Sequence, residues 1–99
     1  MSGTLSTDLN DADAVPYFLW DDPMTVRELG EYLRTASAPE RFRMLGKILR
    51  EARDDHVWRF TTPEEVSRHW NEIAPNLGRR RAFWRWLLDG WRADGLLRG

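Results

Sequence analysis

The chain contains no cysteine, and this absence excludes several kinds of chemistry. Disulfide bridges, thiolate metal sites and cysteine nucleophiles are all ruled out. A chain without cysteine suits a reducing compartment, so we expect a cytoplasmic protein. Lysine is nearly absent as well, because Lys47 is the only one of the 15 basic residues that is not an arginine. Arginine favours forked contacts with carboxylate or phosphate groups, although a genome rich in arginine codons would give the same count.

Long apolar runs and catalytic motifs are also missing. No stretch approaches the roughly 20 apolar residues of a membrane-spanning helix, and the start lacks the pattern of a secretory signal. The sequence has no glycine-rich phosphate loop, nucleophile elbow or zinc-ligand spacing. Residues of metal-binding or acid–base type gather only at Asp54, Asp55, His56 and His69, and adjacent aspartates after a helix normally stay solvated. We therefore predict no membrane contact, no enzymatic activity, and no metal or cofactor.

What the chain does contain is typical of a small globular protein. It has 99 residues, of which 41% are hydrophobic and 31% charged, and its 12% aromatic content includes six tryptophans. The net charge of −1 conceals a segregation of charge along the chain. Residues 1–40 hold two basic and eight acidic side chains (net −6), and residues 41–99 hold thirteen basic and eight acidic ones (net +5).

The N-terminal part is predicted to be irregular. Residues 1–14 are small, polar and acidic, which predicts a flexible tail, with a single helical domain over residues 15–99. The apolar run at residues 15–20 lies between Pro16 and Pro23, which disfavour a long helix. We expect an extended or turned aromatic arm whose large side chains enter the core. The alternative is an exposed docking peptide.

Capping patterns divide the remainder into helices. They predict helices over residues 25–36, 39–53, 62–74 and 78–97, with an extended connector at residues 57–61. Asn76 is expected to cap the last helix, and Gly46, in the interior of the second, would be explained by close packing of a neighbour. The predicted fold class is all-α, a compact bundle of about four helices with an N-terminal aromatic arm and a short extended connector.

The last helix holds two features that folding does not explain. Its apolar stripe is formed by Phe83, Trp84, Leu87, Leu88 and Trp91. Trp86 lies well off that stripe, which means either burial on a second side or an aromatic strip offered to a partner. Arg79, Arg80 and Arg81 stand at a helix start, where acidic side chains are preferred. They are either a solvated start, neutralised by the acidic first half, or a site for phosphate or for carboxylates of a protein.

Four blocks of the sequence resemble a family of small bacterial proteins encoded beside AbiEii-type nucleotidyltransferase toxins. These blocks are YFLWD at 17–21, LGKILREARD at 45–54, VWRFTTPEEV at 57–66, and residues 77–97 with GRRRAFW. The resemblance covers residues 16–97. It implies an antitoxin-like or accessory protein that binds a nucleotidyltransferase partner, on the basis of gene neighbourhood, and it carries over no catalytic residue.

We therefore predict an antitoxin-like protein that neutralises its partner through protein contacts. The expected partner-binding residues are Arg79, Arg80, Arg81, Arg85 and Trp86. The alternative is a small helical domain that binds DNA for autoregulation, or binds RNA. It would use residues spaced to share one helix face, Arg43, Lys47 and Arg50, together with the triple arginine at 79–81. The winged-helix antitoxins related to such systems bind DNA, but this sequence shows no second hairpin for a wing. A structural subunit is a third possibility, and the oligomeric state stays open.

Overall fold

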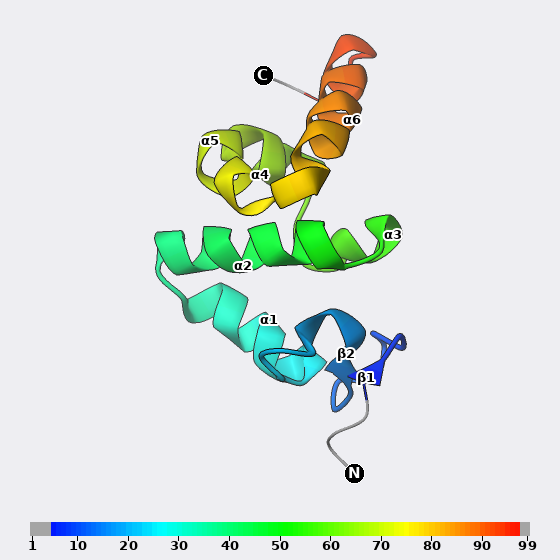
Figure 1. Cartoon of the computed structure of the whole chain (residues 1–99), viewed down its shortest axis with the longest axis vertical. Coiled ribbons are helices and arrows are strands. Elements are labelled where there is room, and N and C mark those ends of the chain that lie inside the picture. The colour runs from blue at the N-terminus through cyan, green and yellow to red at the C-terminus, as the bar shows by residue number, and fades with distance from the viewer. Residues whose placement is uncertain (1–4, 98–99) are drawn as a thin grey trace. The chain divides into compact units, whose positions relative to one another are not determined.

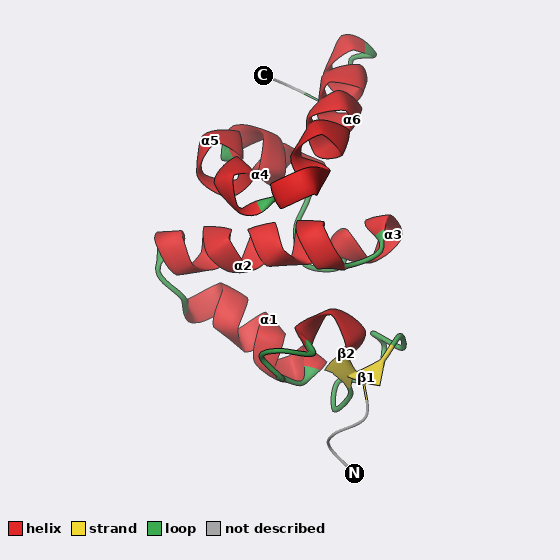
Figure 2. Cartoon of the chain, in the orientation of Figure 1, coloured by secondary structure: helices red, strands yellow, loops and turns green. Residues whose placement is uncertain are grey.

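A computed structural model describes residues 5–97 and shows a mostly helical chain, as predicted (Figures 1 and 2). The described α-helices are α1 (Val26–Thr35), α2 (Ala38–Glu51), α3 (Asp54–Val57), α4 (Pro63–Arg68), α5 (Trp70–Ile73) and α6 (Arg81–Ala93). The 3₁₀ helices are η1 (Tyr17–Leu19), η2 (Ala74–Asn76) and η3 (Gly78–Arg80). The chain divides into two compact units, Met1–Arg41 and Phe42–Gly99, with the boundary inside α2.

The first unit contains a small parallel sheet that the sequence did not predict. Strand β1 (Leu5–Ser6) pairs with β2 (Val15–Pro16), with Leu5 opposite Val15. The acidic residues between them form turns, because Asp8 and Asp11 carboxylates accept hydrogen bonds from backbone amides two residues on. The predicted flexible tail covered residues 1–14. Residues 1–4 lie outside the described residues, and residues 5–14 include β1 and a buried Leu9.

The aromatic arm is a turn of 3₁₀ helix, and its side chains are divided between core and solvent. Phe18 and Leu19 are buried, as expected for residues that fill the core. Trp20, in contrast, is 64% exposed, so the expectation that all the large side chains enter the core is wrong for this residue.

Helix α1 begins at the predicted capping box. The Thr25 amide donates to the Glu28 carboxylate (2.7 Å), and the Glu28 amide donates to the Thr25 hydroxyl (3.1 Å). These bonds satisfy two of the amides that a helix start leaves without partners. Leu29 and Leu33 form the buried side of α1, and the Leu33 carbonyl accepts a hydrogen bond from the Arg41 guanidinium (2.6 Å).

In the second unit, α2 contributes a fully buried face and a close contact at Gly46. Leu45, Ile48 and Leu49 have no exposed surface. A Cβ atom built on Gly46 would lie 2.4 Å from the Asn76 Cβ, so the close packing expected at this glycine is confirmed. Asn76 is correspondingly not the cap of the last helix, because its side chain packs on α2 and α6 begins five residues later without a side-chain cap.

Two predictions about the middle of the second unit are wrong. Residues 54–57 form α3, with Asp54 and Asp55 in its first turn, and a turn follows where an extended connector was expected. Acidic side chains at a helix start are favourable, and a buried Val57 anchors the short helix. The single helix expected over residues 62–74 is broken at His69, whose ring packs against Phe42 with centroids 4.6 Å apart.

Candidate functional site

One side of α6 is anchored firmly in the core of the second unit. Trp84 is completely buried, and its indole N–H donates to the Leu49 carbonyl (2.8 Å). Trp58 lies against both Trp84 and Trp91, with ring centroids 5.6 and 5.9 Å away. The helix is therefore held by a hydrogen bond as well as by aromatic packing, which fixes where its opposite side points.

The opposite side of α6 displays Trp86. This side chain is 70% exposed, and its closest aromatic neighbour is Phe83, at a centroid distance of 6.4 Å. Three residues on its side of the helix are small and exposed, namely Ala82, Gly90 and Ala93, and Phe83 and Asp89 flank Trp86 at i−3 and i+3. We call these three residues together with Trp86 the Trp86 face. Of the two possibilities left open by the sequence, burial of Trp86 on a second side of the helix is thus wrong.

No close packing within the described structure explains why a glycine stands at position 90. A Cβ atom built at this position would meet nothing within 4 Å, in contrast to the 2.4 Å contact at Gly46. Glycine in a helix interior costs about 1 kcal/mol relative to alanine. The fold explains that cost at Gly46 but not at Gly90.

The three arginines at the start of α6 differ in their surroundings. Arg80 forms an ion pair with Asp54, and its guanidinium lies over the rings of Phe83 and Trp84, 4.7 and 5.5 Å from their centroids. Arg80 therefore already has partners within the fold. Arg79 and Arg81 are exposed, and neither side chain forms a hydrogen bond or an ion pair with any residue between 5 and 97.

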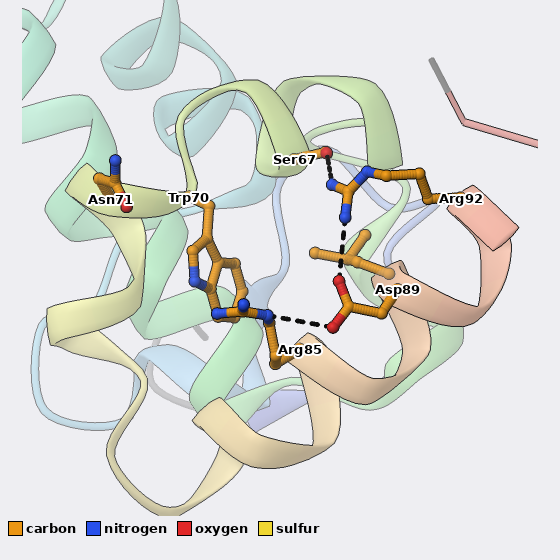
Figure 3. Close-up of a pocket in the computed structure, with 7 residues that line it drawn as sticks. Ser67, Trp70, Asn71, Arg85, Asp89 and Arg92 are labelled. Atoms are coloured by element: carbon orange, nitrogen blue, oxygen red, sulfur yellow. Dashed lines mark hydrogen bonds and ion pairs between the residues drawn. The ribbon is translucent and has the colours of Figure 1, made fainter. Parts of the chain in front are cut away.

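Arg85 belongs to a polar pocket on the flank of α6 (Figure 3). Its Nε donates to Asp89 (3.1 Å), and Arg92 donates to the other oxygen of the same carboxylate (2.9 Å). Arg92 also donates to the hydroxyl of Ser67, on α4. The pocket has a volume of about 380 Å³ and is lined by Ser67, Trp70, Asn71, Arg85, Leu88, Asp89 and Arg92.

Of the residues that line this pocket, only Arg85 was predicted from the sequence to be a binding residue. The spacing of Arg85, Asp89 and Arg92 at i, i+4 and i+7 is a signal that would have revealed the ion-pair chain on α6. No comparable signal links it to Ser67 or Trp70, since these reach the pocket only through the fold.

The predicted nucleic-acid stripe on α2 is only partly available. Arg50 donates to the Asn76 carbonyl (2.9 Å) and to the Glu51 carboxylate (2.9 Å), so its side chain holds η2 against α2. Lys47 is half-buried, whereas Arg43 is exposed. The three residues share a helix face, as their spacing predicted, but one of them has a structural role.

Residues 5–97 contain no group of three or more histidine, cysteine or carboxylate residues placed to hold a metal. Asp54 pairs with Arg80, and the nearest cation to Asp55 is Arg53, at 3.8 Å. Within the same described range, no helix has the length and apolar character needed to cross a membrane.

Comparison with known proteins does not extend this picture: no family model, curated protein or solved structure matches the chain. A function is therefore inferred from the residues themselves and from the resemblance of the four sequence blocks.

Proposed function

We propose that this chain is an antitoxin-like protein that binds and neutralises a nucleotidyltransferase-type toxin through protein contacts. The Trp86 face, together with Arg79 and Arg81, forms the contact surface. The class of partner is supported by the resemblance over residues 16–97. The contact surface is supported by one observation above all, the 70% exposure of Trp86 on a helix whose other side is fixed in the core.

An exposed tryptophan on a fixed helix is well suited to binding. Burying the exposed part of an indole contributes roughly 3 kcal/mol, and little conformational entropy is lost when the backbone is already held. Tryptophan and arginine are also the side chains that most often dominate protein interfaces. Trp86 with Arg79 and Arg81 supplies both types within one stretch of eight residues.

The small residues around Trp86 favour a helix as the element that docks. Ala82, Gly90 and Ala93 leave space on either side of the indole, so a partner backbone can approach α6 closely. Close approach of a partner helix would explain the glycine at position 90, where no described residue packs.

The charge of the surface favours an acidic partner. Arg81 is the first residue of α6, and Arg79 lies just before it in η3. The start of α6 carries partial positive charge, and its first turn has no acidic residue. Carboxylates of the partner would form charge-assisted hydrogen bonds with both guanidiniums.

Co-expression with an AbiEii-type nucleotidyltransferase, starting with any encoded next to the chain, tests the proposal. We expect a stable complex and restored growth, both lost in Trp86→Ala and in the Arg79→Glu/Arg81→Glu variant. Arg80 is left intact so that its contacts with Asp54 and the aromatic rings are kept. Arg43→Glu is the matched control, because it reverses the charge of an exposed arginine that belongs to α2 instead of α6. A complex that survives both changes on α6 would show that the surface is wrong.

The nucleic-acid alternative gives a different result in the same set of variants. Binding of DNA or RNA by the isolated chain, with an affinity that falls steeply with salt and is lost in Arg43→Glu, would replace the proposal. The structural role of Arg50 speaks against this outcome, since only part of the α2 stripe is left to contact phosphates.

A further inference from the structure

The pocket beside α6 has the composition of a site for an anionic group. Arg85 and Arg92 extend from α6 along one wall, and Ser67, Trp70 and Asn71 form the other wall from α4 and α5 (Figure 3). All of these residues belong to the second unit. The two guanidiniums share one carboxylate, that of Asp89, so the three side chains together keep one positive charge.

Most hydrogen-bond donors of the Arg85 guanidinium have no acceptor among the described residues. Its Nε donates to Asp89, and no residue between 5 and 97 accepts from either of its Nη groups. Arg92 is more fully engaged, with one Nη on Asp89 and the other on Ser67. The Arg85 guanidinium, held in place by Asp89, therefore has a pair of donors available to a second anion.

We propose that this pocket receives one acidic side chain of the protein partner. The inference rests on the proposed function and extends it by naming what the partner inserts beside the Trp86 face. Arg85 would bind the incoming carboxylate with its Nη donors. Trp70, which is half-buried, offers apolar surface to the methylene groups of a glutamate.

A carboxylate suits the site better than a phosphate for reasons of charge. Asp89 shows that both guanidiniums bind a carboxylate in this geometry, with one oxygen accepting from each. One net positive charge balances one carboxylate, whereas a phosphate dianion would be left with excess negative charge next to Asp89. The volume of about 380 Å³ is that of a side-chain or small-ligand site and exceeds what a single ion needs.

The pocket and the Trp86 face can engage the same partner. Arg85 precedes Trp86 directly, and Asp89 follows it by three residues, so the pocket rim and the indole occupy adjacent sides of α6. A single partner segment can therefore place an apolar residue on Trp86 and an acidic residue in the pocket.

Asp89 has two opposing effects on such a ligand. It holds Arg85 and Arg92 in place, and it repels the incoming negative charge. Asp89→Asn keeps an oxygen that accepts hydrogen bonds but removes the charge. We therefore expect this variant to bind the ligand roughly two- to five-fold more tightly, the size of effect typical of one exposed charge pair.

Nuclear magnetic resonance on the isolated full chain tests the proposal. The probe is N-acetylglutamate methylamide, and the matched control is its neutral glutamine analogue. We expect the Trp70 indole N–H and the Arg85 and Arg92 Nε–H signals to shift with the glutamate probe alone. Arg85→Gln should abolish these shifts, and Asp89→Asn should strengthen binding. Arg68→Gln, an exposed arginine of α4 that does not line the pocket, should change nothing.

Three results would overturn the inference. They are equal shifts from both probes, unchanged or weaker binding in Asp89→Asn, and inorganic phosphate binding more tightly than the glutamate probe at matched ionic strength. Because the titration contains no partner, its failure is distinct from failure of the proposed function. If the complex forms but the pocket does not bind the glutamate probe, the Trp86 face remains the proposed contact surface and the pocket is not part of it.

Discussion

Gly46 and Asn76 meet so closely that no side chain fits between them. A Cβ atom on Gly46 would lie 2.4 Å from the Asn76 Cβ and 3.4 Å from the Ile73 carbonyl oxygen. The same region is held by the hydrogen bond from Arg50 to the Asn76 carbonyl (2.9 Å). This contact fixes η2 on α2 and so sets where the chain turns toward α6.

Gly46→Ala should destabilise the protein even though alanine is the better helix former. The added methyl group forces backbone and side chain apart, which costs about 1–3 kcal/mol. Urea unfolding followed by circular dichroism measures the change. Asn76→Gly, which removes the clashing Cβ, should recover part of the loss in the double variant, and Asn76→Ala should not. If Gly46→Ala leaves the free energy of unfolding unchanged or raises it, the space between Gly46 and Asn76 is large enough for a methyl group.

Gly90→Ala should have the opposite effect on folding. Its Cβ meets nothing within 4 Å, so only the gain in helix propensity remains, which is about 0.5–1 kcal/mol of added stability. The melting temperature of the isolated chain measures this gain. If a partner helix packs on the Trp86 face, the same substitution should weaken the complex. A more stable variant with undiminished complex formation would remove Gly90 from the contact surface.

Local signals in the sequence predicted local structure well. The Thr25 and Glu28 capping box and the Thr62 cap depend on residues three apart, and both appear where the pattern placed them. Asn76 was misassigned because its side chain serves a contact thirty residues away in the chain. The alternation around Val57 was too short to distinguish a strand from a single helical turn.

The candidate site shows the same division between local and distant information. The angular position of Trp86 on its helix follows from the sequence, and so does its departure from the buried stripe. The pocket does not, since Trp70 and Arg92 come together only through the arrangement of α4, α5 and α6. The different roles of Arg79, Arg80 and Arg81 also depend on a distant residue, Asp54.

Arg80→Ala should lower stability, whereas Arg79→Ala and Arg81→Ala should not. The Arg80 guanidinium pairs with Asp54 and lies over the Phe83 and Trp84 rings, and these half-exposed contacts together contribute about 1 kcal/mol. Changes at exposed residues without such contacts stay within about 0.5 kcal/mol. Chemical denaturation of the three variants and a double-mutant cycle with Asp54→Asn measure the difference. Equal stabilities for all three would mean that Arg80 is as available to a partner as its neighbours.

Trp84 and Trp86, two residues apart on α6, should respond in opposite ways to truncation. Trp84→Ala removes a fully buried indole and leaves the Leu49 carbonyl without its donor, which should cost about 3–5 kcal/mol or prevent folding. Trp86→Ala removes a side chain that is 70% exposed, so the free energy of unfolding should change by less than about 1 kcal/mol. Urea unfolding of both variants measures these values, and Trp84→Phe serves if Trp84→Ala does not fold. In the complex the order should reverse, with Trp86→Ala reducing affinity about tenfold or more while the folded Trp84→Phe binds normally. A Trp86→Ala variant that unfolds more readily and still binds would assign Trp86 to the fold and leave the proposed contact surface without its central residue.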